Sequence, residues 1–237
     1  MRAPSASRLL LVPALLFAAG VAPLAAQEAG HQPSHEHGDH AQHADPDHAV
    51  QGGGAIPAGW AVRSDDAEGT ANVKVAPMGQ GMHVTLGPAI ILYKENSGGT
   101  GPFHALATFT QTRKATHPEG YGLFYGGQAL DGARQKYTYF LVRQDGTYLV
   151  KRREGEKTTE VTKGWVASPA VKQLDAKGTA SNLLEIDAKR DPSKVVFMVN
   201  GQPVHTLDAK ATDVNGVVGI RVNHNLDLHI DGFDVHR

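Results

Sequence analysis

The chain has 237 residues, no cysteine and a formal net charge of −1 at neutral pH. The absence of cysteine excludes disulfides, thiolate metal sites and a lipid anchor on cysteine. The near-neutral charge gives no sign of the basic surface that tracks nucleic-acid phosphates, so no nucleic-acid partner is predicted.

Residues 1–26 are predicted to be a signal peptide. Arg2 and Arg8 supply a positive start, an uncharged apolar run covers residues 9–19, and small residues precede Gln27. The apolar run is shorter than the roughly 20 residues that a membrane helix needs, so an uncleaved anchor is disfavoured. We therefore expect a secreted or periplasmic protein with no membrane span after cleavage.

Residues 27–58 are predicted to form a disordered linker, because they hold almost no large apolar side chain. Imidazoles interspersed with carboxylates can bind zinc, copper or nickel, so this segment is a candidate labile metal site. The alternative is a solvated low-complexity linker with no metal role, and no cofactor is required. The candidate ligands are His31, His35, His37, His40, His43 and His48.

Residues 59–237 are predicted to form one all-β domain. Short β-rich segments follow one another between Gly, Asp, Asn and Pro residues, and no amphipathic helix is evident, so an antiparallel sandwich is favoured. The expected strands cover residues 60–63, 72–75, 83–86, 89–93, 104–111, 122–125, 137–143, 147–153, 183–188, 194–199, 203–207, 217–222 and 226–235.

Turn residues mark two hairpins and a bulge. Gly146 links residues 137–143 to residues 147–153 and can take positive φ at little cost. Both faces of this hairpin carry apolar side chains, which predicts that its sheet is covered at least partly on both sides. Asn200-Gly201 is a favoured type I′ turn pair. In the last strand the apolar phase shifts at Gly232, which indicates a bulge or bend.

Several motifs together carry a family resemblance. They are Gly122–Gly126, Tyr137–Phe140, Asp145–Leu149, Asn182–Ile186, Phe197–Gly201, Val218–Ile220 and Ile230–Val235. The region from residue 59 onward resembles the concanavalin A-like, laminin G-like jelly-roll domains of exported bacterial proteins. It is most similar to the branch named after 3-keto-disaccharide hydrolases. The resemblance implies two antiparallel sheets, with ligands often bound on a concave face or at the loop rim.

The last strand supplies the candidate ligand-binding residues. Asp227, His229 and Asp231 alternate along one face, a pattern that suits sugar hydroxyls or a cation such as calcium. If that face is concave, tyrosines of neighbouring strands would add stacking surface for a sugar ring. An ordinary solvent-facing strand is the alternative. The tyrosines in question are Tyr121, Tyr125, Tyr137 and Tyr139.

No catalytic residue is predicted. Glu185-Ile186-Asp187 resembles the start of the catalytic strand in family 16 glycoside hydrolases, but the second glutamate of that strand is missing. A retaining glycosidase needs two placed carboxyl groups, so Glu185 and Asp187 are expected to be ordinary solvated side chains.

The sequence favours an exported, lectin-like sandwich that binds carbohydrate or an extracellular protein without catalysis. One alternative is a glycan-directed hydrolase of the 3-keto-disaccharide type. The other is an extracytoplasmic metal-binding protein that acts through its histidines.

The mature exported chain is expected to begin at Gln27, because small residues end the signal segment there. Intact-mass spectrometry of the secreted or periplasmic protein tests this expectation. A soluble exported protein that still begins at Met1 would contradict it.

Overall fold

The computed structural model describes residues 50–65 and 69–237. The predicted signal peptide and all six linker histidines lie outside these residues. Residues 52 and 53 run beside one edge of the domain, where Gly53 forms a parallel bridge with Lys74. No helix within the described ranges is long and apolar enough to cross a membrane.

The first sheet has the strand order β1-β4-β14-β6-β7-β8-β10, with β9 paired to β8. All of its neighbouring strands are antiparallel. Its strands are β1 (Trp60–Ser64), β4 (Ile90–Lys94), β6 (Gly120–Gln128), β7 (Lys136–Arg143), β8 (Thr147–Glu154), β9 (Lys157–Glu160), β10 (Val166–Ala167) and β14 (Val217–Val222).

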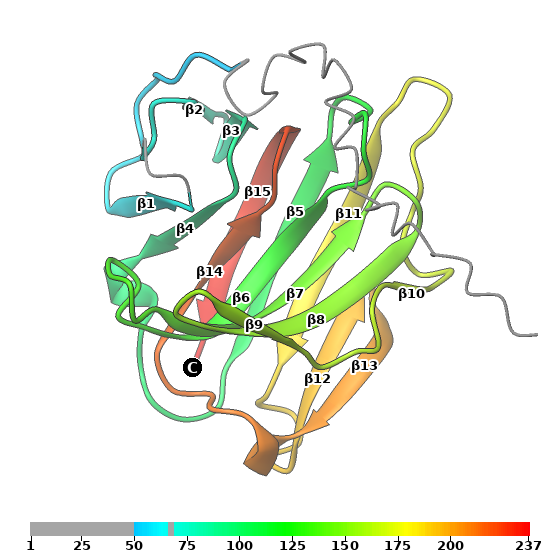
Figure 1. Ribbon diagram of the computed structural model, residues 1–237. Helices are drawn as coiled ribbons and strands as arrows, with labels where there is room; N and C mark the ends of the chain where they lie inside the picture. Colours follow the sequence, from blue (N-terminus) through cyan, green and yellow to red (C-terminus); the bar gives the residue numbers. More distant parts are fainter. Residues whose placement is uncertain (1–49, 66–68) are drawn as a thin grey trace, which may run out of the picture. The chain divides into compact units, whose positions relative to one another are not determined.

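The second sheet has the order β13-β12-β11-β5-β15-β3-β2 and is also antiparallel throughout. Figure 1 shows β15 and β5 side by side near its middle. Its strands are β2 (Val73–Met78), β3 (Gly81–Leu86), β5 (His104–Gln111), β11 (Ala180–Asp187), β12 (Lys194–Val199), β13 (Gln202–Asp208) and β15 (Leu226–His236).

The two sheets form a β-sandwich, which confirms the predicted fold class. Each of the thirteen expected strands is present, with ends displaced by a few residues. β9 and β10 were not expected, because the Lys-Thr-Thr-Glu of β9 is wholly exposed and has no apolar alternation. Two short 3₁₀ turns, η2 (Glu95–Ser97) and η3 (Ala209–Ala211), complete the described elements.

The main core fills the space between the sheets. Leu123 and Phe140 of the first sheet and Phe109, Leu184 and Phe197 of the second are fully buried there. Each such side chain contributes about 1.5–3 kcal/mol relative to exposure. Because side chains alternate between the two faces of a strand, every second residue of the central strands lies in this core.

The outward face of the first sheet carries a second apolar cluster. Tyr137, Tyr139 and Leu141 of β7 pack there with Phe124 of β6 and Ile91 of β4. Tyr139 is only 8% exposed and Leu141 is fully buried. The prediction that the central hairpin is covered on both faces is confirmed.

The predicted turn geometry is confirmed at three places. Gly146 has φ +82°, and Asn200 and Gly201 have φ +51° and +75°, as a type I′ turn requires. At Gly232, φ is +62°, and the pairing of β15 with β5 shifts register between Asp231 and Asp234. The register shift is the bulge expected from the change of apolar phase.

Gly146→Val is expected to destabilise the domain by about 1–3 kcal/mol, because a β-branched residue is strained at this φ. The new Cβ would also lie 2.7 Å from Nε2 of Gln173. Urea unfolding measures the effect. Gly132→Val is the matched control, since Gly132 is not at positive φ and its nearest neighbour, the Ala129 carbonyl oxygen, would be 3.9 Å from the new Cβ. Equal stability of the two variants would contradict the prediction.

Candidate functional site

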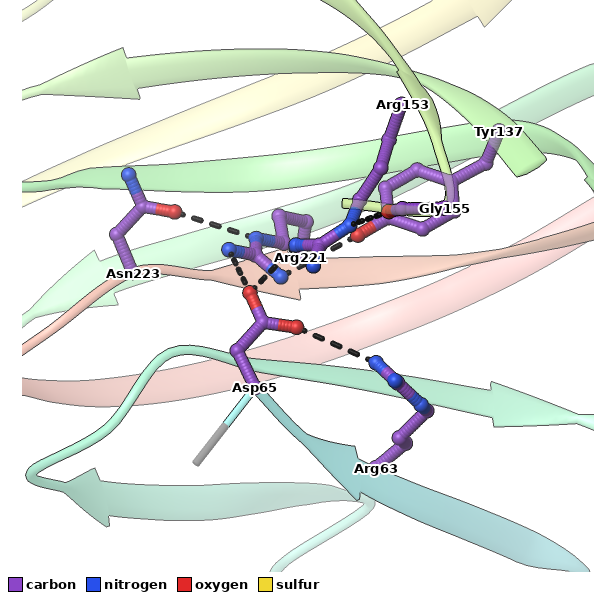
Figure 2. A network of polar contacts seen from close by, with 7 residues as sticks. All are labelled: Arg63, Asp65, Tyr137, Arg153, Gly155, Arg221 and Asn223. Carbon is purple, nitrogen blue, oxygen red and sulfur yellow. Dashed lines mark hydrogen bonds and ion pairs between the residues drawn. The ribbon is translucent and has the colours of Figure 1, made fainter. Parts of the chain in front are cut away.

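The carboxylate of Asp65 forms ion pairs with three guanidinium groups on the outward face of the first sheet. Asp65 follows β1, and its Oδ2 lies 2.7 Å from Nη1 of Arg153 on β8 and 2.7 Å from Nη2 of Arg221 on β14. Its Oδ1 lies 3.3 Å from Nη1 of Arg63. Figure 2 shows the three arginines, from three different strands, converging on Asp65.

Arg221 is the buried member of this network, with a side chain only 9% exposed. Its Nη1 donates to the hydroxyl of Tyr137 at 3.3 Å, and its Nε donates to Oδ1 of Asn223 at 3.2 Å. Burial acts to lower the pKa of Arg221, but Tyr137 and Asp65 outweigh it and raise the pKa. The guanidinium is therefore charged and held in one orientation.

Asp65 is ionised by the same contacts. Burial acts to raise the pKa of this carboxyl, but the charges and hydrogen bonds of Arg221 and then Arg153 prevail and lower it. Nearby Tyr139 has its pKa raised to about 12, chiefly by burial. Its hydroxyl is consequently a neutral group at physiological pH.

A pocket of about 350 Å³ opens beside the network, where β6, β7 and β8 meet the segment after β13. We call it the rim pocket. Tyr137 and Arg153 belong to both the rim pocket and the Asp65 network. The residues that line it are Tyr125, Gly126, Gln128, Lys136, Tyr137, Thr138, Arg152, Arg153, Glu154, Ala211, Thr212 and Asp213.

Hydrogen bonds hold the polar groups of the rim pocket in place. The hydroxyls of Tyr125 and Thr212 are 2.9 Å apart, and Nε2 of Gln128 donates to Oδ2 of Asp213 at 3.0 Å. Nη2 of Arg152 donates to the carbonyl oxygen of Ala211 at 2.6 Å. The pocket thus presents hydroxyl, amide, carboxylate and guanidinium groups, a combination that binds polyhydroxylated ligands. The rings of Tyr125 and Tyr137 lie behind these groups and are buried.

Other hollows lack this combination. Hollows of about 620 Å³ and 560 Å³, formed by residues 113–119 and 173–178 with their neighbours, have no Phe, Tyr or Trp in their walls. A hollow of about 530 Å³ offers the ring of Trp60, but its charged and amide groups are only Lys94 and Asn96. The rim pocket is smaller, yet it alone among these four has guanidinium, carboxylate and tyrosine hydroxyl groups together in its wall.

The structure places the predicted triplet of β15 on the outward face of the second sheet. Asp227, His229 and Asp231 alternate with the buried Leu228 and Ile230, as expected. Oδ1 of Asp227 lies 2.9 Å from Nε2 of His83 on β3, and the carboxylate also accepts from the hydroxyl of Thr112. Within residues 50–65 and 69–237, no three His, Asp or Glu side chains are arranged to hold a metal ion.

The predicted tyrosines do not join that triplet, which corrects the expectation of a shared surface. Tyr121 and Tyr125 point from β6 into the core between the sheets and are fully buried, so their rings cannot stack on a sugar at the triplet. Tyr137 and Tyr139 belong to the outward face of the other sheet. The inward tyrosines of β6 and the outward tyrosines of β7 therefore lie on opposite faces of the first sheet. Tyr137 and Asp227 are on the two outward faces of the sandwich, with both sheets between them.

Glu185 and Asp187 are not ordinary solvated side chains, so that expectation is wrong. Oε2 of Glu185 is 3.1 Å from Nε2 of His104, and its side chain is 15% exposed. Asp187 is buried, and its Oδ1 accepts from the backbone N–H groups of Lys189 and Arg190, both at 2.9 Å. Burial acts to raise the pKa of Asp187, but these hydrogen bonds lower it.

No family model and no curated protein sequence matches the chain. Solved structures do. The carbohydrate-binding module CBM66 of Bacillus subtilis matches with a TM-score of 0.55 and 11% identity, over 76% of this chain and 96% of that one. A Bacillus subtilis protein of unknown function with a galectin-like fold gives 0.51 and 12%, over 75% and 88%. The carbohydrate recognition domain of Emp47p gives 0.51 and 10%, over 81% and 93%.

The domain is a jelly roll of the concanavalin A type. At such low identity the likeness establishes the fold and carries no residue roles. The predicted fold resemblance is therefore confirmed at the level of the sandwich.

Sequence reasoning did not find the Asp65 network, because its members are far apart in the chain and share no spacing. One signal was available. Arg221 interrupts the apolar run of β14, Val-Val-Gly-Ile-Arg-Val, and a charged residue in a buried strand nearly always has a partner. The identity of that partner depends on β14 lying between β4 and β6.

Asp65→Asn is expected to lower the free energy of unfolding by about 3 kcal/mol at neutral pH, because it leaves the Arg221 charge buried without its counter-ion. The stabilisation from Asp65 is present above its unfolded-state pKa of about 3.9 and is lost as the pH falls through its lower folded-state pKa. The difference between wild type and variant should therefore shrink in acid.

Urea unfolding at a series of pH values measures this difference. Asp131→Asn, at an exposed position, is the control and should change stability by less than about 0.5 kcal/mol. A difference between wild type and Asp65→Asn that is constant down to strongly acidic pH would show that the ion pair does not operate.

Proposed function

We propose that this protein binds carbohydrate in the rim pocket and acts as an exported lectin-like module without catalysis. The observation that carries the proposal is the placing of the Arg153 guanidinium with fixed hydroxyl, amide and carboxylate groups around one small pocket. Sugar rings are bound through hydrogen bonds between their hydroxyls and polar groups of this kind.

The fold supports the proposal by analogy. Both CBM66 and the Emp47p domain are described as carbohydrate-binding or carbohydrate-recognising, and each covers about three-quarters or more of this chain. Fold alone does not determine function, so the argument rests on the pocket. Its volume of about 350 Å³ is near the lower limit of ligand pockets and suits one or two sugar rings rather than a long chain.

Binding is favoured over hydrolysis because the candidate acids of β11 are engaged elsewhere. Glu185 pairs with His104, and Asp187 accepts two backbone N–H groups of the turn that follows it. A 3-keto-disaccharide hydrolase remains the alternative suggested by the family resemblance. Incubation with oligosaccharides and keto-sugars, followed by mass spectrometry, would reveal turnover and would then refute the non-catalytic part of the proposal.

A pair of double variants tests the location. Gln128→Ala with Thr212→Ala removes an amide and a hydroxyl group from the rim pocket without changing its charge, and is expected to weaken binding about tenfold or more, since each lost polar contact costs on the order of 1 kcal/mol. Binding of each oligosaccharide that scores on a glycan array is measured by calorimetry. The matched control is Asp227→Ala with Asp231→Ala on the other sheet, which should leave affinity unchanged.

Two results would contradict the proposal. Loss of binding in the Asp227 and Asp231 double variant alone would move the site to the face that the sequence favours. Failure of the wild-type chain to bind any glycan on the array would remove the carbohydrate assignment itself. Circular dichroism of each variant ensures that a lost signal does not reflect unfolding.

A further inference from the structure

We propose that the ligand of the rim pocket is anionic: a sugar that carries a carboxylate or a sulfate ester. The inference rests on the proposed carbohydrate binding and specifies its substrate class. It comes from the balance of charge in and beside the pocket, which the binding of neutral sugars does not require.

The cations outnumber the carboxylates. The pocket wall contains three cations and two carboxylates, and the adjoining Asp65 network adds two further arginines and one carboxylate. The cations are Lys136, Arg152, Arg153, Arg63 and Arg221, and the carboxylates are Glu154, Asp213 and Asp65. Two positive charges therefore have no counterpart within this group.

The ion pairs show where the surplus lies. Lys136 is neutralised by Glu154, whose Oε1 is 2.5 Å from its Nζ. Asp65 is the single carboxylate that forms ion pairs with the three guanidinium groups of its network. Arg152 donates to a neutral carbonyl oxygen, and no ion pair to it occurs among the described residues. Asp213, which accepts from Gln128, offsets one positive charge, so the pocket wall keeps a net charge of +1. The cations of the wall that have no carboxylate to themselves are Arg152 and Arg153, which are consecutive on β8.

Arg152 and Arg153 are well suited to bind an anion. Arg153 is 15% exposed and held by Asp65 and by the carbonyl oxygen of Gly155 at 2.9 Å, so little side-chain entropy is left to lose. Both guanidinium groups line the pocket, so an anionic ligand there is attracted by each of them. A carboxylate or sulfate can accept two parallel N–H bonds from one guanidinium, which a sugar hydroxyl cannot do.

Calorimetry with a matched pair of probes tests the inference on the full chain. The probes are trigalacturonate and the same trisaccharide with its carboxyls methyl-esterified, which has the same ring and linkage geometry without the charge. We expect the acid to bind at least about tenfold more tightly in about 20 mM sodium chloride. The advantage should shrink in about 300 mM salt, because these groups are partly exposed and are screened. A sulfated neutral trisaccharide distinguishes sulfate from carboxylate as the preferred anion.

Arg152→Met should abolish the preference for the acid while preserving the fold, since Arg152 makes one backbone contact and lies outside the Asp65 network. Arg152→Lys should retain part of it, because lysine keeps the charge but not the planar fork. Arg113→Met, which removes an exposed arginine from the wall of another hollow, is the control and should behave as wild type.

The outcomes separate this inference from the proposed function. Equal affinity for all the probes, or a preference for the acid that survives in Arg152→Met, would overturn the anionic ligand and leave carbohydrate binding intact. Binding of a short DNA duplex as tightly as the acid would also overturn it, because the pocket would then be a general anion surface. Absence of binding to every sugar, including those of the array, would instead remove the carbohydrate function on which the inference depends.

Discussion

The buried charge of Arg221 is the constraint on which the outward face of the first sheet depends. A guanidinium that is 9% exposed in an otherwise apolar strand is costly unless it is paired. Asp65 supplies the counter-ion, and Tyr137 and Asn223 accept further hydrogen bonds from the Arg221 guanidinium. This requirement ties together β1, β7 and β14, which are distant in sequence.

The same contacts shape the rim pocket. Arg153 is held by Asp65, and Tyr137 is held by Arg221. Two of the residues that line the pocket are therefore positioned by contacts outside it. A ligand that binds there meets groups whose orientation is already determined, and little additional ordering is needed on binding. The stability of the sheet and the geometry of the pocket therefore depend on the same carboxylate.

Alternation along β7 and β8 explains how one pocket can use residues from both faces of a sheet. Tyr137 and Arg153 point outward, whereas Thr138 and Arg152 point toward the second sheet. In the middle of the sheet such neighbours would be separated by the backbone layer. Near the strand ends, where η3 and the residues after it pass by, both sets are accessible to one ligand.

The strands and turns were predictable because they depend on local physics. Alternating apolar residues mark strands wherever one face is buried, and Gly146, Asn200 and Gly201 mark turns because their backbone angles exclude most other residues. β9 escaped prediction because an exposed edge strand has no apolar face to reveal it. The apolar residues on both faces of the central hairpin also correctly indicated a sheet covered on both sides.

The candidate site was only partly predictable. The sequence by itself determined the β-rich architecture, its principal turns and the face on which Asp227, His229 and Asp231 alternate, because these follow from spacing along one strand. Only the tertiary structure decided that Tyr137 lies across the sandwich from that triplet, and that Asp65 meets Arg153 and Arg221. The order of strands in a sheet is set by pairing between distant segments. The spacing of residues along one strand does not indicate which distant residue will lie beside a buried charge.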